Sequence, residues 1–216
     1  MKKPRRGGRP SREASALLGD RILEVATELF LDLGYGATSI EQIVARARIS
    51  KRTFYYRFPD KAALFAAVVR RIADGLRPPT VAGLFVGGSL EEVLTRLAEA
   101  ILRAVLHPQA LALHRVILAE SGRFPELAEV VANRSAGREA VKRIGALLQR
   151  DVTTRGLSLD ASHFAATQFL QMVIASPQRR ALGMGVPMTA AELDVWARQS
   201  VTLFLGGCRG WIERGR

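Results

Sequence analysis

The chain has 216 residues, of which 48% are hydrophobic and 24% charged, so it can bury a sizeable core and is not a disordered protein. Its formal net charge of +12 favours a polyanionic partner, either nucleic acid or an anionic membrane surface. The excess lies towards the N-terminus, because residues 1–77 hold 16 Lys and Arg against 8 Asp and Glu, whereas residues 78–216 hold 16 against 12.

Residues 1–17 are expected to form a basic, flexible arm. The first twelve of them, MKKPRRGGRPSR, contain six basic residues and no acidic one. Two interpretations stay open. Arginines on flexible glycines suit insertion into a narrow minor groove, and they equally suit a solubilising tail. No signal-peptide core follows, since charges interrupt EASALLGDR, and no apolar run approaches the roughly 18 residues that span a bilayer. A cytoplasmic protein without a membrane partner is therefore expected.

Apolar residues at helical spacing predict four helices in the first third of the chain, over 20–33, 39–46, 50–57 and 60–74. Two short helices joined by a tight turn at 47–49, behind a longer supporting helix, are typical of a helix-turn-helix unit. Thr38 with Glu41 fits a capping box at the second helix, and Asp60 fits an N-cap of the fourth. The expected small core is Ile40, Ile43, Val44, Ile49, Phe54 and Phe58.

The third of these helices has an unusual surface. With Phe54 and Phe58 turned inward, the other sides carry three basic residues, two tyrosines and a threonine: Lys51, Arg52, Arg57, Tyr55, Tyr56 and Thr53. Ser50 stands at the N-cap position. Arginine can bind a guanine edge bidentately, and hydroxyl groups can bond phosphate oxygens. The alternative is that both tyrosines merely cover the surface of the domain.

The remainder of the chain, after a Gly- and Pro-containing linker at 75–88, predicts about five helices separated at Pro108, Pro125, Pro177 and Pro187. Further capping boxes fit Ser89 with Glu92 and Thr189 with Glu192. Without any sustained strand-like alternation, the fold class is all-α. Segments 160–176 and 190–212 are rich in large apolar residues, which suits either a dimer interface or an ordinary core. Charged residues at Phe169 and Phe204 are expected to split a dimer.

Residues 21–69 resemble the DNA-binding domain of the TetR/AcrR family of bacterial transcriptional regulators. The resemblance rests on the aromatic and glycine residues at 33–36, Thr38, the segment SKRTFYYRF at 50–58 and Lys61. The segment RVILAESGRFPELAEVV at 115–131 further resembles the C-terminal domain of AefR-like repressors. The resemblance implies a DNA-binding domain at 18–76 and a helical ligand-binding and dimerisation domain at 77–216.

By position, the resemblance also implies DNA contacts. Thr38 and Ser39 would hold a phosphate at the start of the second helix, and Tyr56 and Lys61 would hold the backbone. The groove would be faced by Lys51, Arg52, Thr53, Tyr55 and Arg57, with Ser50 at the helix start. Two positions depart from the family, because Arg48 and Arg52 stand where glycine is common. Either the turn accepts a non-glycine residue at modest cost, or its geometry differs.

Candidates for other chemistry are few. The histidines have no zinc-ligand spacing, Cys208 suits packing, and no catalytic or nucleotide-binding motif occurs, so no metal, no cofactor and no enzyme activity are expected. His114, Phe164 and Gln168 are the candidate ligand-binding residues, although His114 also fits a core histidine. The resemblance to the TetR/AcrR family thus implies a homodimeric repressor that binds a palindromic double-stranded DNA operator and is released by a small-molecule effector. The alternative is a ligand-independent or activating regulator.

Overall fold

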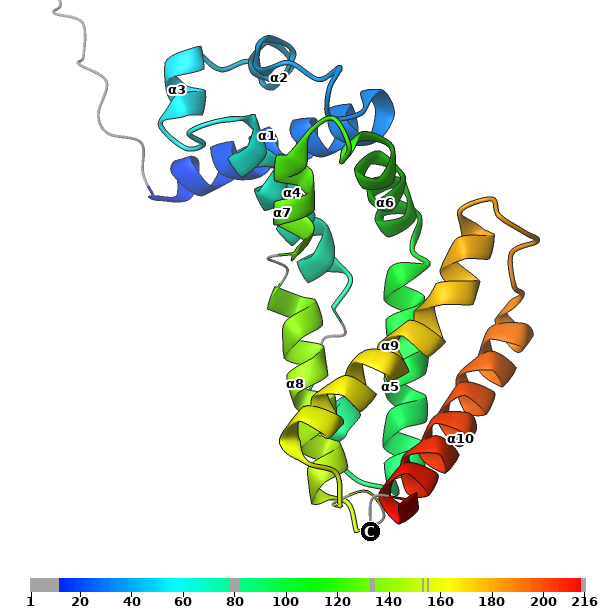
Figure 1. The fold of residues 1–216 in the computed structure, drawn as a ribbon. Helices are drawn as coiled ribbons and strands as arrows, with labels where there is room; N and C mark the ends of the chain where they lie inside the picture. The colour runs from blue at the N-terminus through cyan, green and yellow to red at the C-terminus, as the bar shows by residue number, and fades with distance from the viewer. Residues whose placement is uncertain (1–11, 78–81, 133–134, 153, 155, 215–216) are drawn as a thin grey trace, which may run out of the picture. The chain divides into compact units, whose positions relative to one another are not determined.

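The computed structural model describes residues 12–77, 82–132, 135–152, 154 and 156–214, and all of its regular elements are helices (Figure 1). Among these residues there is no strand, which confirms the all-α fold class. None of the described helices combines the length and the apolar character needed to cross a bilayer. The elements are α1 (Arg12–Leu33), α2 (Ile40–Ala47), α3 (Lys51–Tyr55), α4 (Lys61–Gly75), the 3-10 helix η1 (Ala82–Phe85), α5 (Leu90–Val105), α6 (Pro108–Glu120), α7 (Pro125–Ala132), α8 (Ser135–Arg150), α9 (Leu159–Ala181) and α10 (Ala190–Arg214).

The chain forms two compact units, and each unit is made of two separate stretches of the sequence. The first unit, called the head below, contains the residues up to Arg71 together with Val116–Ala128. The second unit contains Ile72–Arg115 and the residues from Glu129 onwards. The sequence led us to expect a single boundary after residue 76. The head instead also includes the end of α6 and the start of α7.

The head is built around an aromatic core. Phe30 of α1 and Phe65 of α4 are fully buried with an edge-to-face ring contact at 5.2 Å, and α2 packs against α1. Phe54 is also fully buried, and its ring lies 5.9 Å from that of Phe58. This arrangement confirms that the pair, four residues apart, shares the inner face of the third helical segment. The helix-turn-helix prediction is confirmed with it.

Two helix starts differ from the sequence-based expectation. α1 begins at Arg12, so the predicted flexible arm at 1–17 is wrong for residues 12–17, where Ala16, Leu17 and Leu18 are strong helix formers. Residues 1–11 lie outside the described part of the chain. The capping box of α2 is Ser39 with Gln42, not Thr38 with Glu41. The boxes at Ser89 and Thr189 and the Asp60 cap are confirmed.

The second unit packs α9 against α8, α5 and α10 (Figure 1). Its core includes Leu94 and Leu97 of α5, Ile144 and Leu148 of α8, Phe169 and Val173 of α9, and Val201 and Phe204 of α10. The rings of Phe169 and Phe204 lie 5.1 Å apart, and Phe169 is fully buried. Charges at Phe169 and Phe204 were expected to split a dimer, and this effect stays a prediction. Such charges would first disrupt the core of the unit.

Pro177 was expected to end a helix, but it lies inside α9. Proline has no N–H, so the carbonyl of Val173, four residues earlier, loses its helical donor. The indole Nε1–H of Trp196 on α10 donates to that carbonyl at 3.0 Å. The hydrogen bond from α10 thus replaces the one that the proline removes, and α9 continues to Ala181.

Candidate nucleic-acid interface

The turn between α2 and α3 contains a non-glycine residue in the left-handed region. Arg48 has φ 54° and ψ 50°, and the N–H of Ile49 donates to the carbonyl of Val44 at 3.0 Å. This geometry is the usual way to end a helix, although glycine usually occupies the position. Of the two alternatives that the sequence left open, the first is correct: the turn accepts arginine, at a cost in backbone strain.

α3 is shorter than expected and is fixed at its start. It spans Lys51–Tyr55, and Tyr56 is its C-cap. Ser50 is the N-cap, since its Oγ accepts from the N–H of Thr53 at 3.1 Å. The Ser50 and Thr53 hydroxyl oxygens also lie 2.8 Å apart, within hydrogen-bonding distance. Both side chains are therefore held at the first turn of α3.

Three side chains of this segment point to solvent. Arg52 is exposed, Tyr55 is 52% exposed and Tyr56 is 85% exposed. Tyr55 contacts the buried Phe54 ring edge to face at 5.3 Å, so its ring is fixed on one side. Arg52 and Tyr56 make no side-chain hydrogen bond or ion pair with any residue that the structure describes. This group offers a guanidinium and two phenols to a partner.

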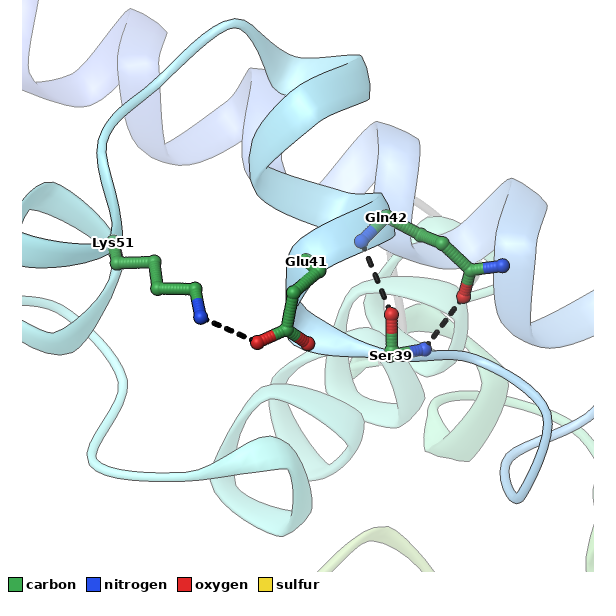
Figure 2. A network of polar contacts seen from close by, with 4 residues as sticks. All are labelled: Ser39, Glu41, Gln42 and Lys51. Atoms are coloured by element: carbon green, nitrogen blue, oxygen red, sulfur yellow. Dashed lines mark hydrogen bonds and ion pairs between the residues drawn. The ribbon is translucent and has the colours of Figure 1, made fainter.

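Lys51 contacts α2 across the turn. Its Nζ donates to Glu41 Oε1 at 2.5 Å, beside the capping box of Ser39 and Gln42 (Figure 2). The hydrogen bond to Lys51 lowers the pKa of Glu41, and the same bond raises the pKa of Lys51. Both side chains are solvent-exposed, so water screens this ion pair. A phosphate can compete for the ammonium group.

The start of α2 presents Ser39 but not the Thr38 side chain. Thr38 is fully buried, and its hydroxyl donates to the carbonyls of Leu29 and Gly34 at 3.1 and 2.7 Å. The Thr38 hydroxyl is therefore bound inside the head, and the phosphate contact expected at Thr38 stays a prediction. Ser39 Oγ accepts from the N–H of Gln42 at 3.1 Å, while Gln42 Oε1 accepts from the N–H of Ser39 at 2.7 Å (Figure 2).

Arg57 and Lys61 are turned into the head. The Arg57 guanidinium donates to the backbone carbonyl of Ser15 and, at 2.7 Å, to its hydroxyl. Lys61 Nζ donates to the carbonyls of Tyr35 and Thr38 at 2.9 and 3.0 Å, and burial lowers its pKa. The expected groove contact of Arg57 stays a prediction, and in this structure its guanidinium is bound to Ser15. The contacts of Lys61 place its ammonium on protein carbonyls, where a phosphate contact had been expected.

The candidate ligand-binding residues lie in the second unit. His114 is half-buried on α6, whereas Phe164 and Gln168 are exposed one turn apart on α9. The Phe164 ring contacts that of Trp211 on α10 at 5.7 Å. A ligand-binding role of the three residues stays a prediction. Within the described residues, no group of His, Cys, Asp and Glu side chains could hold a metal ion.

Sequence reasoning missed three residues of the head that come from the second half of the chain. Glu120, Phe124 and Glu126 all contact Tyr35 in the loop between α1 and α2. They lie in the segment 115–131 whose resemblance to AefR-like proteins was visible in the sequence. Nothing in its periodicity indicates that it belongs to the head, because a tertiary contact across 85 residues leaves no local pattern.

A helix-turn-helix with a solvent-facing arginine and two exposed tyrosines is typical of DNA-binding proteins. Comparison with protein families supports the same class. Residues 22–68 match the tetR family of bacterial regulatory proteins, and residues 92–207 match the C-terminal domain of AefR-like transcriptional repressors. The chain belongs to the TetR family of bacterial transcriptional regulators, with an AefR-like C-terminal domain. The members are DNA-binding regulators and not enzymes.

Individual relatives agree with this assignment. An HTH-type transcriptional regulator of Mycobacterium bovis is 34% identical over 114 residues, which is 52% of each chain. The chain thus spans about half the length of these curated relatives. Among solved structures, a TetR-family regulator from Mesorhizobium loti is 29% identical, with a TM-score of 0.72 over 91% of this chain and 98% of its own. The flavonoid-responsive regulator FrrA is also 29% identical, with a TM-score of 0.71 over 89% and 97%.

Proposed function

We propose that the protein is a homodimeric repressor that binds a pseudo-palindromic DNA operator through α2 and α3 and is released by a small-molecule effector. The observation that carries the proposal is the exposed group of Arg52, Tyr55 and Tyr56 on a helix-turn-helix. The sign of regulation is supported by the match to AefR-like repressors. The response to an effector is supported by the likeness to FrrA, which is described as flavonoid-responsive.

The chemistry of the exposed residues suits a division between base and backbone contacts. Arg52 can donate two parallel hydrogen bonds to a guanine edge, which distinguishes base pairs in the major groove. The Tyr55 and Tyr56 hydroxyls can donate to phosphate oxygens, and so can the hydroxyl of Ser39 beside the groove. Lys51 adds a phosphate contact when its ammonium group leaves the exposed ion pair with Glu41 and binds a phosphate oxygen instead. These contacts position the head and read the sequence.

Dimerisation is proposed to use the outer faces of α9 and α10. Phe164 is 56% exposed on α9, and Leu203 is 70% exposed on α10. The centre of the exposed Trp211 ring lies 5.7 Å from that of Phe164, so apolar surface continues from α9 to α10. Large exposed apolar surface of this kind marks an interface. A two-fold dimer would then place two heads on two half-sites of one operator.

Effector action requires only a modest difference in affinity. A ligand that prefers the conformation with low DNA affinity by about 1–3 kcal/mol would weaken operator binding roughly 5- to 150-fold. The binding pocket is unidentified, with His114, Phe164 and Gln168 as its candidate residues. Because the target is chromosomal DNA, we expect the protein to act in the cytoplasm.

The experiment begins with selection of bound duplexes from a randomised library by the purified protein. The enriched duplex is then titrated by fluorescence anisotropy with and without a panel of flavonoids, and a reporter placed behind it gives the sign of regulation. Enrichment of an inverted repeat, weaker binding with one compound and higher reporter output with that compound are expected. Lower output without the protein would identify an activator, and an unchanged titration across a wider compound library would favour a ligand-independent regulator.

A further inference from the structure

The loop between α1 and α2 is held by a carboxylate from the end of α6. Glu120 Oε1 accepts from the N–H of Tyr35 at 2.7 Å, and Glu120 Oε2 accepts from the N–H of Gly36 at 2.5 Å. One carboxylate therefore binds two backbone amides of one loop. Hydrogen bonds to an ionised acceptor are about twice as strong as neutral ones.

The loop is shaped to receive this carboxylate. A Cβ atom at Gly34 would lie 2.3 Å from Glu120 Oε1, and one at Gly36 would lie 2.9 Å from Glu120 Oε2. The φ of Gly34 is +87°, a conformation that residues with a Cβ rarely adopt. Glycines on both sides of Tyr35 thus allow the close approach of Glu120.

The Tyr35 side chain makes a second set of contacts between the loop and the segment Val116–Ala128. Its ring is 2% exposed and contacts the Phe124 ring edge to face at 5.1 Å, and its hydroxyl donates to Glu126 Oε1 at 3.1 Å. Burial, followed by the hydrogen bond to Glu126, raises the pKa of Tyr35. The phenol therefore stays protonated and remains a donor at neutral pH.

Lys61 holds the loop from the other side. Its Nζ lies 4.4 Å from the Tyr35 ring centre and donates to the carbonyls of Tyr35 and Thr38. The loop's N–H groups are thus bound by an anion and its carbonyls by a cation. Immediately after Thr38 comes Ser39, the N-cap of α2. Whatever fixes residues 34–38 also fixes the start of α2.

We propose that Glu120 is a positioning residue for DNA recognition, so that the DNA-binding head is complete only with the segment Val116–Ala128. Glu120 orients the start of α2 through the backbone of residues 35–36, and it touches no DNA. Lys61 acts on the same loop through the carbonyls and is likewise a positioning residue. This inference rests on the proposed function for its DNA readout, but the hold on the loop can be measured without DNA.

The test uses the full chain with Glu120→Gln, which keeps the side-chain size and removes the charge. Glu129→Gln, at an exposed residue of α7, is the matched control. In amide hydrogen exchange followed by NMR, the N–H groups of Tyr35 and Gly36 are expected to exchange about tenfold faster in Glu120→Gln and unchanged in the control. Affinity for the duplex selected by the wild type is expected to fall about tenfold at a temperature where both variants are folded.

A second arm separates positioning from direct DNA contact. Lys61→Met is expected to weaken binding without changing the slope of log affinity against log salt, whereas loss of a phosphate contact lowers that slope by about 0.9. Unchanged amide exchange and unchanged affinity in Glu120→Gln would overturn the proposal. If Glu120→Gln does not fold, Tyr35→Phe replaces it, since this variant removes the hydrogen bond from the loop to Glu126 of the same segment. Wild-type affinity in Tyr35→Phe would then overturn the claim that the head needs the segment Val116–Ala128. If the wild type selects no duplex, the proposed function fails while the exchange measurement still decides the role of Glu120 in the loop.

Discussion

Replacing Trp196 with phenylalanine removes the Nε1–H group that donates to the Val173 carbonyl, while keeping most of the aromatic surface. That carbonyl has no helical donor, because Pro177 stands four residues later in α9. In the wild type the Trp196 Nε1–H donates to it at 3.0 Å. The replacement therefore leaves an acceptor inside the second unit without a protein donor.

The expected loss of unfolding free energy follows from this geometry. A buried acceptor that loses its donor costs about 1–3 kcal/mol of stability. In a Pro177→Ala background the alanine N–H can donate to Val173 as in a regular helix, so the same tryptophan replacement should cost less. The difference between the two backgrounds, the coupling energy, is expected to be about 1 kcal/mol or more.

The assay is urea unfolding of the wild type, both single variants and the double variant at fixed protein concentration. Two-state fits to each curve give the four unfolding free energies. Additive effects of Trp196→Phe and Pro177→Ala would show that the indole does not compensate for the proline, and the reasoning about α9 would be refuted.

Four further predictions test other parts of the structure. Arg48→Gly is expected to raise the unfolding free energy by about 1 kcal/mol, since glycine adopts positive φ without strain; a lower value in urea unfolding would contradict this. Leu203→Asp is expected to raise the dimer dissociation constant at least about tenfold in sedimentation while the chain stays folded, whereas Phe169→Asp should unfold it; a folded, fully dimeric Leu203→Asp would move the interface elsewhere. Tyr56→Phe is expected to weaken binding to selected and random duplexes alike, by about three- to tenfold in anisotropy titrations, and a loss confined to one base pair would make Tyr56 a base reader. The Cys208 thiol, whose pKa is raised by burial, is expected to react with a disulfide reagent only as fast as the unit opens, and rapid reaction at low urea would contradict its buried position.

Periodicity and capping patterns predicted most of the local structure. The positions of Phe54 and Phe58 followed from helical spacing, and Ser50, Asp60 and Ser89 were recognisable as caps because each bonds a backbone N–H three residues away. Exposure of Tyr55 and Tyr56 followed from the inward direction of the two phenylalanines. These features depend on neighbours within one or two turns, which a sequence displays directly.

Features that depend on distant partners could not be predicted in this way. The sequence predicts a helix end at Pro177, because the compensating donor, Trp196, comes from another helix and leaves no local pattern. Arg57 and Lys61 look like surface cations in the sequence. Their direction is decided by acceptors on Ser15 and on the loop at 35–38. The membership of Glu120 in the head depends on contacts across 85 residues.

The central claim, that α3 reads base sequence through Arg52, is tested most directly by selection from randomised duplexes with the wild type and Arg52→Ala. The wild type is expected to enrich an inverted repeat. Arg52→Ala is expected to bind the best duplex about 1–3 kcal/mol more weakly and to lose preference at one or two base pairs in each half-site. An Arg52→Ala variant that enriches the same sequences with the same preferences would contradict the claim.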